Sequence, residues 1–406
     1  MEIFQKIIEM TSYNELINQP RYLIMIFIAC FLLYLGIVKK YEPLLLVPIA
    51  FGVLISNIPG SNLGVVKLDE SIGLIKIAQD YGIINFLYYS LIKTGFLPPL
   101  IFMGVGALTD FGPMLKNLRL VFFGAAAQIG IFSVLIVASL LGFTNQEAAS
   151  LAIIGGADGP TAIYTSIILA PHLLAPIAIA AYSYMALVPV IIPFIVKFTI
   201  SKNEILINMK EQDEKNKVKD EIKNLDSIKI IFPILMTLVV SLIVPSSTPL
   251  IGFLMFGNLI KEIGSSTARL SKAVSDNILN TSTVFLGLSI GATMTPSSFL
   301  NIQTLGIIIG GLLAFVISIT GGIFAVKLFN LFTKKKINPL IGATGLSAVP
   351  MASRVANDIA LKYDPNNHLM HYAMASNISG VIGSAVAAGV LISSRAMRQF
   401  YIVRRS

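Results

Sequence analysis

The chain has 406 residues, of which 55% are hydrophobic and only 13% are charged. A soluble domain carries about 25% charged residues, so roughly half of the charge expected of a soluble protein is missing. The apolar residues come in long blocks, and residues 22–38 carry no charge over nearly the length of a membrane span. We therefore predict an all-α polytopic membrane protein.

Residues 1–94 are predicted to hold the first membrane segments. The first apolar block is followed by Lys39 and Lys40 rather than by the small residues of a cleavage site, so we expect a retained span and no removed signal peptide. Cys30 is the one cysteine of the chain, which excludes an internal disulfide and a cysteine metal site. Residues 70–93 are compatible with an extracytoplasmic amphipathic segment, a re-entrant loop or a span. The number of spans and the side of the C-terminus therefore stay open.

The net charge of +9 does not indicate nucleic-acid binding, because the basic residues gather at the ends of the apolar blocks. This distribution is typical of cytoplasmic loops in a multi-pass protein of the cell membrane, that is, the inner or cytoplasmic membrane. The residues concerned are Lys39, Lys40, Lys116, Arg119, Lys334, Lys335, Lys336, Arg395, Arg398, Arg404 and Arg405.

A charged stretch divides the apolar sequence in two. Residues 202–226 hold six lysines and seven acidic residues, which is 13 of the 51 charged residues in the chain. We predict a cytoplasmic loop over 201–227, with a solvated linker as the preferred interpretation and a docking surface as the alternative. The sequences on either side, 95–200 and 228–406, are predicted to be related halves.

Two pairs of motifs support this duplication. FMGVGALTDFGP at 102–113 matches FLGLSIGATMTP at 285–296 in a Phe, a Gly and a Pro, and ADGPTA at 157–162 matches ATGLSA at 343–348. The offsets of the two pairs, 183 and 186 residues, nearly agree. Duplicated halves with spans interrupted by Gly and Pro are typical of transporters with an ion site at the bilayer midplane. We predict two related, inverted halves whose broken helices meet at such a site.

The stretch IIGGADGPTAIYTS, residues 153–166, places Asp158 inside an apolar block. A charge at bilayer depth costs about 2.5–3.5 kcal/mol on insertion scales, and such groups usually handle ions or protons. The flanking glycines and Pro160 are expected to break the helix and free backbone carbonyls, which is tolerated where the chain lines a cavity or is buried in protein. The alternative is a loop aspartate that caps the helix beginning at Pro160. Carboxylate and carbonyl oxygens would suit Na⁺ together with the hydroxyls of Thr161, Thr165 and Ser166.

The matching segment of the second half, residues 336–358, again combines helix breakers with polar oxygens. Thr344 stands where the first half has Asp158. Arg354 either pairs with Asp358 one helical turn away or attracts an anionic substrate, and both interpretations stay open.

Residues 372–392 carry small residues at every fourth position, which permits close helix packing. We interpret Ser384 as a packing residue and Asn377 as the better ligand candidate. By itself, the position of Tyr184 favours an interfacial or packing role.

The sequence gives no support to ATP-driven or hydrolytic chemistry, because it contains no GxxxxGK, GxSxG or HExxH motif. His368 and His371 flank a span beside the sequence DPNN, which favours a surface turn over a metal site.

Three stretches, GGADGPTAIYTS, NPLIGATGLSAVPMASRV and NISGVIGSAVAAGVLI, resemble the membrane β-subunits of sodium-ion-pumping, biotin-dependent decarboxylases. That family serves oxaloacetate, methylmalonyl-CoA, glutaconyl-CoA and malonate systems. The resemblance covers most of the chain from about residue 95 onward, and the GGADGPT string is highly specific. It implies an enzyme subunit, a translocase that decarboxylates carboxybiotin and couples this reaction to Na⁺ export.

The resemblance also implies roles for individual residues. Asp158 matches the essential Na⁺-linked carboxylate, and Tyr184 matches a tyrosine assigned to the second ion site or the proton path. Arg354 is expected to bind carboxybiotin, and with Asp158, Ser347 and Tyr184 it forms the expected catalytic set. The expected Na⁺ ligands are Asp158, Asn338, Gly342, Ser347 and Asn377.

No Met-Lys-Met biotinylation site occurs in the chain, so biotin is expected to arrive on a partner. The implied partners are a carboxyltransferase α-subunit, a biotin carrier subunit and a small membrane subunit of the γ or δ type, in a complex that holds several copies of this chain. The alternative function is a secondary Na⁺- or H⁺-coupled transporter without decarboxylase chemistry. A membrane scaffold would not explain an intramembrane aspartate.

Overall fold

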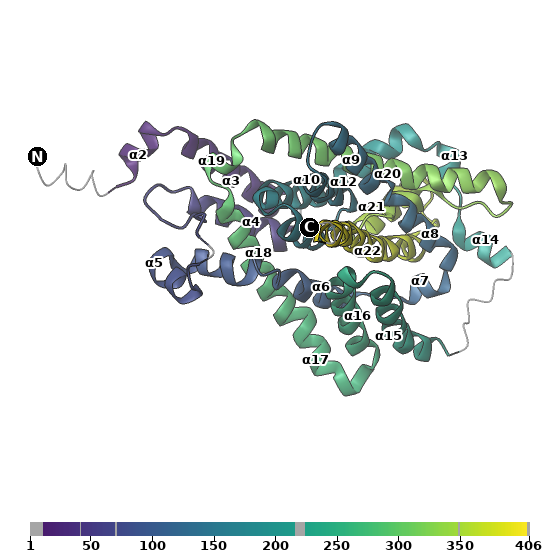
Figure 1. Ribbon diagram of the computed structural model, residues 1–406. Coiled ribbons are helices and arrows are strands. Elements are labelled where there is room, and N and C mark those ends of the chain that lie inside the picture. Colours follow the sequence, from purple (N-terminus) through teal and green to yellow (C-terminus); the bar gives the residue numbers. More distant parts are fainter. Residues whose placement is uncertain (1–10, 41, 70, 216–223, 348–349, 404–406) are drawn as a thin grey trace, which may run out of the picture.

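The computed structural model describes residues 11–40, 42–69, 71–215, 224–347 and 350–403. Within these ranges every regular element is a helix, which confirms the all-α prediction (Figure 1). The N-terminal segment and the first half contain α2 (Tyr13–Asn18), α3 (Arg21–Ile37), α4 (Pro43–Ser56), α5 (Leu74–Leu87), η1 (Tyr88–Ile92), α6 (Leu97–Leu108), α7 (Gly112–Lys116), α8 (Leu118–Ala127), α9 (Ile129–Leu140), α10 (Asn145–Ala152), η2 (Ile153–Gly156), α11 (Gly159–Leu169), η3 (Pro171–Leu173) and α12 (Leu174–Thr199).

The charged stretch and the second half contain the remaining elements. They are α13 (Lys202–Ile205), α14 (Met209–Lys215), α15 (Leu225–Ile243), η4 (Pro245–Ser247), α16 (Thr248–Glu262), η5 (Gly264–Thr267), α17 (Ala268–Lys272), η6 (Ala273–Ile278), α18 (Leu279–Thr293), α19 (Pro296–Phe299), α20 (Ile302–Phe332), η7 (Pro339–Thr344), α21 (Met351–Tyr363) and α22 (Met370–Val403).

Four helical segments among the described residues are long and apolar enough to cross a membrane, namely Leu118–Leu140, Leu225–Ile243, Ile302–Phe332 and Met370–Ser394. In the most apolar stretch of Met370–Ser394, 72% of the residues are buried. In that of Leu225–Ile243, only 6% are buried. The C-terminal span therefore lies inside the bundle, and α15 lies at its edge (Figure 1). Leu140, Leu242 and Phe332 are each more than 80% exposed, as expected of side chains that face lipid. The chain is a multi-pass membrane protein.

Two further pairs of helices are bent. Leu74–Ile92 meets Leu97–Leu108 at 70°, which makes residues 74–92 part of a broken span or a re-entrant loop. Pro171–Met185 meets Leu187–Thr199 at 64°. Pro189 lies inside α12 and has no N–H to donate to Met185 four residues earlier, and its ring crowds that carbonyl, so a bend at this point is expected.

The two helices that carry the first pair of sequence motifs each pack closely against another helix. The first pair of sequence motifs begins in α6 and α18, and α6 packs on α16 of the second half while α18 packs on α4 of the N-terminal segment. Each crossing is a close approach of backbones, because a Cβ added at Gly106 would overlap the Leu254 carbonyl and one at Gly291 would overlap the Ile49 carbonyl. The duplication itself stays a prediction, as does the inverted orientation of the halves.

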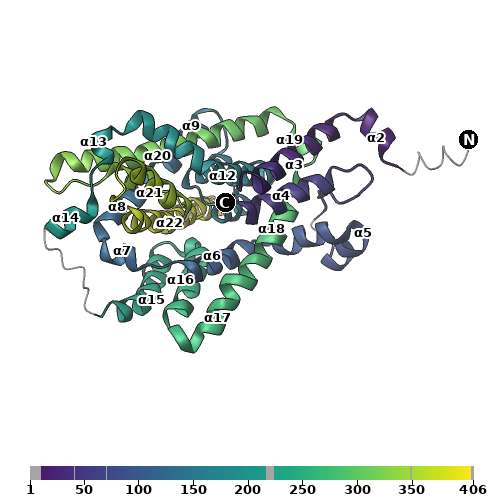
Figure 2. The same cartoon turned by 180° about the vertical axis from the view of Figure 1, so that it is seen from behind.

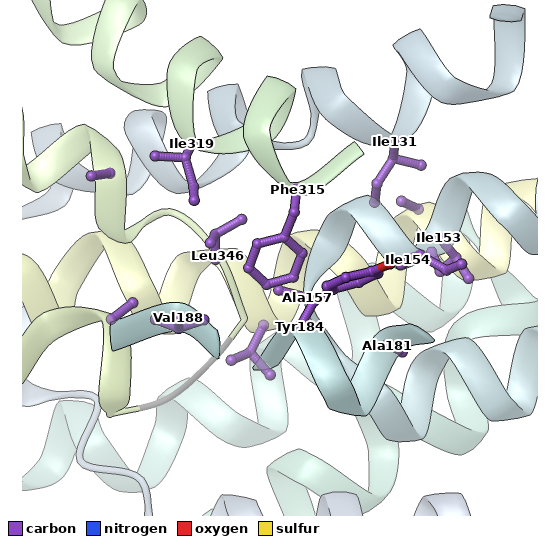
Figure 3. Close-up of a cluster of buried hydrophobic side chains, with 14 of the residues drawn as sticks. Ile131, Ile153, Ile154, Ala157, Ala181, Tyr184, Val188, Phe315, Ile319 and Leu346 are labelled. Carbon is purple, nitrogen blue, oxygen red and sulfur yellow. The ribbon is translucent and has the colours of Figure 1, made fainter. Parts of the chain in front are cut away.

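The larger hydrophobic core surrounds the place where the two halves meet. Figure 3 shows Tyr184 and Phe315 in this core close to Ala157 and Leu346, which directly precede Asp158 and Ser347 in the sequence. The polar groups described below are therefore enclosed by apolar side chains.

The beginning of the charged stretch is folded onto the protein, which corrects the interpretation of 202–226 as a wholly solvated linker. Ile205 and Met209 are buried, and Glu204 forms an ion pair of 2.9 Å with Lys327 of α20. Figure 2 shows α13 and α14 at the opposite end of the molecule from α2. A role of 210–226 as a linker or docking surface stays a prediction, and residues 216–223 lie outside the described part of the chain.

Candidate ion-binding site

The helix α10 and the 3₁₀ turn η2 that continues it end at Gly156, two residues before Asp158. Thr144 and Glu147 form a capping box at the start of α10, and the chain then tightens into the 3₁₀ turn η2. Ala157 has a left-handed backbone with φ 56°, a conformation that costs a non-glycine residue roughly 1 kcal/mol or more. This turn ends the first helix, and α11 starts in a new direction with Asp158 at its N-cap.

Asp158 is both a helix cap and the centre of a buried polar cluster. Its Oδ1 accepts a hydrogen bond of 3.2 Å from the Thr161 N–H, as expected of a capping aspartate. Its Oδ2 is 3.0 Å from Ser347 Oγ and 2.8 Å from Ser384 Oγ, and both hydroxyls come from the second half. The residue is 4% exposed. Asp158 therefore caps α11 and also lies in a buried polar cluster, so the two roles that the sequence presents as alternatives are compatible.

Ser384 has more acceptors than it can serve. Its Oγ lies 2.8 Å from Asp158 Oδ2 and 2.9 Å from the Val381 carbonyl oxygen, and a hydroxyl has a single proton to donate. When that proton points to Val381, the oxygen presents lone pairs to the neighbourhood of Asp158. Ser384 can therefore either support an ionised carboxylate or help to bind a cation next to it.

A hydroxyl and a backbone N–H of the second half donate hydrogen bonds to the backbone carbonyls that the helix break frees. The Gly155 carbonyl accepts a hydrogen bond of 2.6 Å from Ser318 Oγ, and the Gly156 carbonyl accepts one of 3.0 Å from the Ser347 N–H. Because buried carbonyls need partners, these two bonds stabilise the break at its observed position. They also fix Ser347 beside Asp158.

In the part of the chain that the structure describes, no basic side chain pairs with the Asp158 carboxylate. Among the described residues Asp158 takes part in no ion pair, and no group of three His, Cys, Asp or Glu side chains is positioned to hold a metal ion. A buried carboxylate without a cation is costly, and hydroxyl donors offset only part of that cost. A bound proton or a small alkali cation would complete the charge balance.

Asn377 and Gly342 lie around the second broken segment, η7. The Asn377 amide donates to the carbonyls of Thr344 and Leu346, while its Oδ1 is buried and has no partner. Gly342 packs against Gly322 of α20 so closely that a Cβ on either would overlap the carbonyl of the other. Asn377 therefore holds the segment that carries Ser347 and keeps one oxygen free for a ligand.

Asn338 has a different environment from the one predicted. Its amide donates to the carbonyls of Ile205 and Ile207 at 2.8 and 2.9 Å, and its Oδ1 accepts from the Leu340 N–H. Asn367 donates to the same two carbonyls. In this arrangement Asn338 holds the segment after α12 against the second half, and its oxygen is already used.

Tyr184 and Arg354 make no hydrogen bond or ion pair with Asp158. The Tyr184 hydroxyl donates to the Ile308 carbonyl of α20, and its ring lies against Phe315 (Figure 3). Arg354 is exposed on α21, forms no ion pair with Asp358 among the described residues, and interacts electrostatically with Glu42 at the start of α4. Burial raises the pKa of Glu42, and Arg354 acts in the opposite direction.

The structure thus brings together Asp158, Ser347 and, near them, Asn377, and it adds residues that the sequence did not single out. Ser384 had been assigned to packing, and Ser318 had no assigned role. Of the three hydroxyls behind Asp158, those of Thr165 and Ser166 bond to carbonyls of their own helix, and Thr161 alone has no partner. The sequence signal that could have identified Ser384 is a polar side chain on the small-residue face of residues 372–392.

Comparisons with known proteins agree with this architecture. The profile of the family described as Na⁺-transporting oxaloacetate decarboxylase beta subunit matches residues 21–395. The methylmalonyl-CoA decarboxylase subunit beta of Propionigenium modestum is 46% identical over 382 residues, which cover 91% of this chain and 94% of that protein. Oxaloacetate decarboxylase beta chain 2 of Salmonella typhimurium is 43% identical over 416 residues, with coverage of 91% and 94%.

A third relative has a different acyl-CoA in its name. The glutaconyl-CoA decarboxylase subunit beta of Acidaminococcus fermentans is 45% identical over 370 residues, covering 91% of this chain and 92% of that protein. All three relatives are β-subunits of decarboxylases, so this chain is one subunit of a larger complex. The chain belongs to the family of Na⁺-transporting oxaloacetate decarboxylase β-subunits.

Proposed function

We propose that this subunit decarboxylates carboxybiotin presented by a carrier subunit and couples the reaction to Na⁺ export. One observation carries the ion-binding part of the proposal. A carboxylate that is 4% exposed lies at a break between helices, two serines of the other half donate to it, and it has no basic partner among the described residues. Family membership supports the decarboxylation part.

Na⁺ and a proton would occupy the Asp158 carboxylate in turn. Its Oδ1 and Oδ2, the hydroxyl oxygens of Ser347 and Ser384 and the free Oδ1 of Asn377 are hard oxygen ligands suited to Na⁺. Binding Na⁺ beside an already buried carboxylate offsets the cost of its charge. When Na⁺ arrives, the proton leaves the carboxylate and becomes available to the reaction.

The reaction breaks the bond between the biotin ureido nitrogen and the carboxylate carbon. CO₂ leaves, and the nitrogen accepts one proton, which in this proposal comes from the Asp158 cluster. Arg354, exposed on α21, would attract the anionic carboxybiotin. Tyr184 stays a candidate for the proton path, with its hydroxyl directed at the Ile308 carbonyl.

The proposed partners follow from this reaction. A biotin carrier subunit brings carboxybiotin, a carboxyltransferase α-subunit loads it, and a small membrane subunit of the γ or δ type completes the complex with several copies of this chain. Oxaloacetate, methylmalonyl-CoA and glutaconyl-CoA, which the relatives' names mention, are candidate acyl substrates. We place the complex in the cytoplasmic membrane.

The test is decarboxylation by the native complex with and without Na⁺, before and after addition of avidin. The proposal expects activity that requires Na⁺ and is blocked by avidin. Na⁺ uptake into vesicles without any avidin-sensitive decarboxylation would instead support a secondary transporter that uses the same site.

A further inference from the structure

Two buried hydroxyls near Asp158 have no hydrogen-bond partner. Thr161 is 0% exposed and Tyr182 is 3% exposed, and neither Thr161 Oγ1 nor the Tyr182 hydroxyl finds a partner in the structure. The backbone N–H of Thr161 is the group that caps Oδ1 at 3.2 Å. Its own hydroxyl lies close to the carboxylate without reaching hydrogen-bond geometry.

Tyr182 approaches the neighbourhood of Asp158 from α12. Its ring lies directly over Gly159, so that a Cβ added at Gly159 would overlap the ring carbons next to the hydroxyl. Gly159 follows Asp158 in the chain, and Tyr182 and Asp158 are close enough to interact electrostatically. Tyr184, two residues along the same helix, differs because its hydroxyl donates to the Ile308 carbonyl.

Two unsatisfied hydroxyls in one place are expensive for a folded protein. A buried hydroxyl without a partner has lost its hydrogen bonds to water and gained none in return, which destabilises the fold. A phenylalanine and a valine would fill nearly the same volumes at these positions without that cost. Oxygen atoms that face a buried carboxylate and lack partners are, however, the arrangement that a bound cation requires.

We propose that the Tyr182 hydroxyl and Thr161 Oγ1 are ligands of the cation that binds Asp158, and that they form the side of the site opposite Ser347 and Ser384. This inference deepens the proposed function and rests on it. In the cation-bound state both hydroxyls direct a lone pair at the ion, so their oxygens become satisfied. The ring of Tyr182, held against Gly159, sets the distance between its oxygen and the carboxylate.

Two substitutions remove one oxygen each and keep the packing. Tyr182→Phe keeps the aromatic ring and Thr161→Val keeps the branched side chain. Thr161→Ser keeps the hydroxyl and serves as the control for Thr161→Val. Tyr164→Phe is a matched control, because Tyr164 lies on α11 with its ring against Gly95 rather than against Gly159. Each purified complex is titrated with NaCl, and both the melting temperature and the decarboxylation rate are measured.

Tyr182→Phe and Thr161→Val should each raise the half-saturating Na⁺ concentration at least about tenfold in both measurements. About tenfold is the lower end of the loss in metal affinity when a group that supports a metal is removed. Thr161→Ser and Tyr164→Phe should titrate as the wild type does. Half-saturation at the wild-type Na⁺ concentration in both Tyr182→Phe and Thr161→Val would overturn the inference.

Asp158→Asn separates this result from the wider proposal. If that variant loses the Na⁺-dependent rise in melting temperature while Tyr182→Phe and Thr161→Val keep it unchanged, only the two ligands are wrong. If Asp158→Asn itself keeps the Na⁺-dependent rise, the ion site is elsewhere and the proposed function fails at its centre.

Discussion

Removal of the Ser384 hydroxyl should weaken Na⁺ binding strongly while leaving the fold intact. Ser384→Ala deletes one oxygen from a fully buried position on α22, and that oxygen lies 2.8 Å from Asp158 Oδ2. A hydrogen bond to a charged group contributes about 1.5–3 kcal/mol. At 1.4 kcal/mol for each factor of ten, its loss corresponds to a change of about 10- to 150-fold in affinity.

The same oxygen has two functions in our account, so the effect should lie within this range rather than below it. Without Ser384 the ionised carboxylate loses a donor, and the bound Na⁺ loses a ligand. The measurement is the half-saturating Na⁺ concentration of decarboxylation by the purified complex at fixed pH. The melting temperature in saturating Na⁺ reports separately on folding.

Ser379→Ala provides the matched control on the same helix. Ser379 Oγ donates to the Val121 carbonyl at 2.6 Å, so this variant also loses one buried hydroxyl but touches no group of the ion site. It should titrate with Na⁺ as the wild type does. Equal half-saturation in Ser384→Ala, Ser379→Ala and the wild type would refute the assignment of Ser384 to the site.

Three further predictions follow from other contacts. Gly159→Ala should lower the melting temperature and raise the half-saturating Na⁺ concentration, because the added Cβ would overlap the Tyr182 ring; a variant that behaves as wild type in both measurements would contradict the packing. Arg354→Gln should slow carrier-linked decarboxylation while Na⁺ still raises the melting temperature, and normal turnover would exclude a role in attracting the substrate. Burial acts to raise the pKa of Asp110, but hydrogen bonds from Lys229 at 2.7 Å and from a backbone N–H outweigh it and hold the pKa below its usual range. The stability from Asp110 is therefore present above its unfolded pKa of about 3.9 and is lost as pH falls through the lower folded value, so Asp110→Asn should flatten acid unfolding below about pH 4, and an unchanged profile would show that the pair adds nothing.

Local sequence patterns were sufficient for the helical class, for the break at Asp158 and for the related broken segment of the second half. These features depend on glycines, prolines and apolar blocks, whose effects act over a few residues. The broken segments are also joined to each other as predicted, through Ser347 and the Gly156 carbonyl.

The partners of Asp158 could not be predicted in the same way. Ser347 and Ser384 lie 189 and 226 residues further along the chain, and no local pattern encodes contacts of that length. Ser384 is part of a stripe of small residues, so packing was the simpler interpretation. The structural role of Ile205 could not be predicted, because this residue lies in a charged stretch. Its carbonyl accepts hydrogen bonds from the buried amides of Asn338 and Asn367.

The most direct test of the central claim is the Na⁺ dependence of decarboxylation at several pH values in the wild type, Asp158→Asn and Asp158→Glu. Because Na⁺ and H⁺ compete for one carboxylate, the half-saturating Na⁺ concentration of the wild type should rise as pH falls. Asp158→Asn is nearly isosteric and should fold but lose Na⁺-stimulated turnover. Asp158→Glu keeps the charge and should retain some Na⁺-dependent turnover with poorer affinity. Na⁺-stimulated decarboxylation near the wild-type rate in Asp158→Asn would contradict the account and leave Asp158 as a helix cap alone.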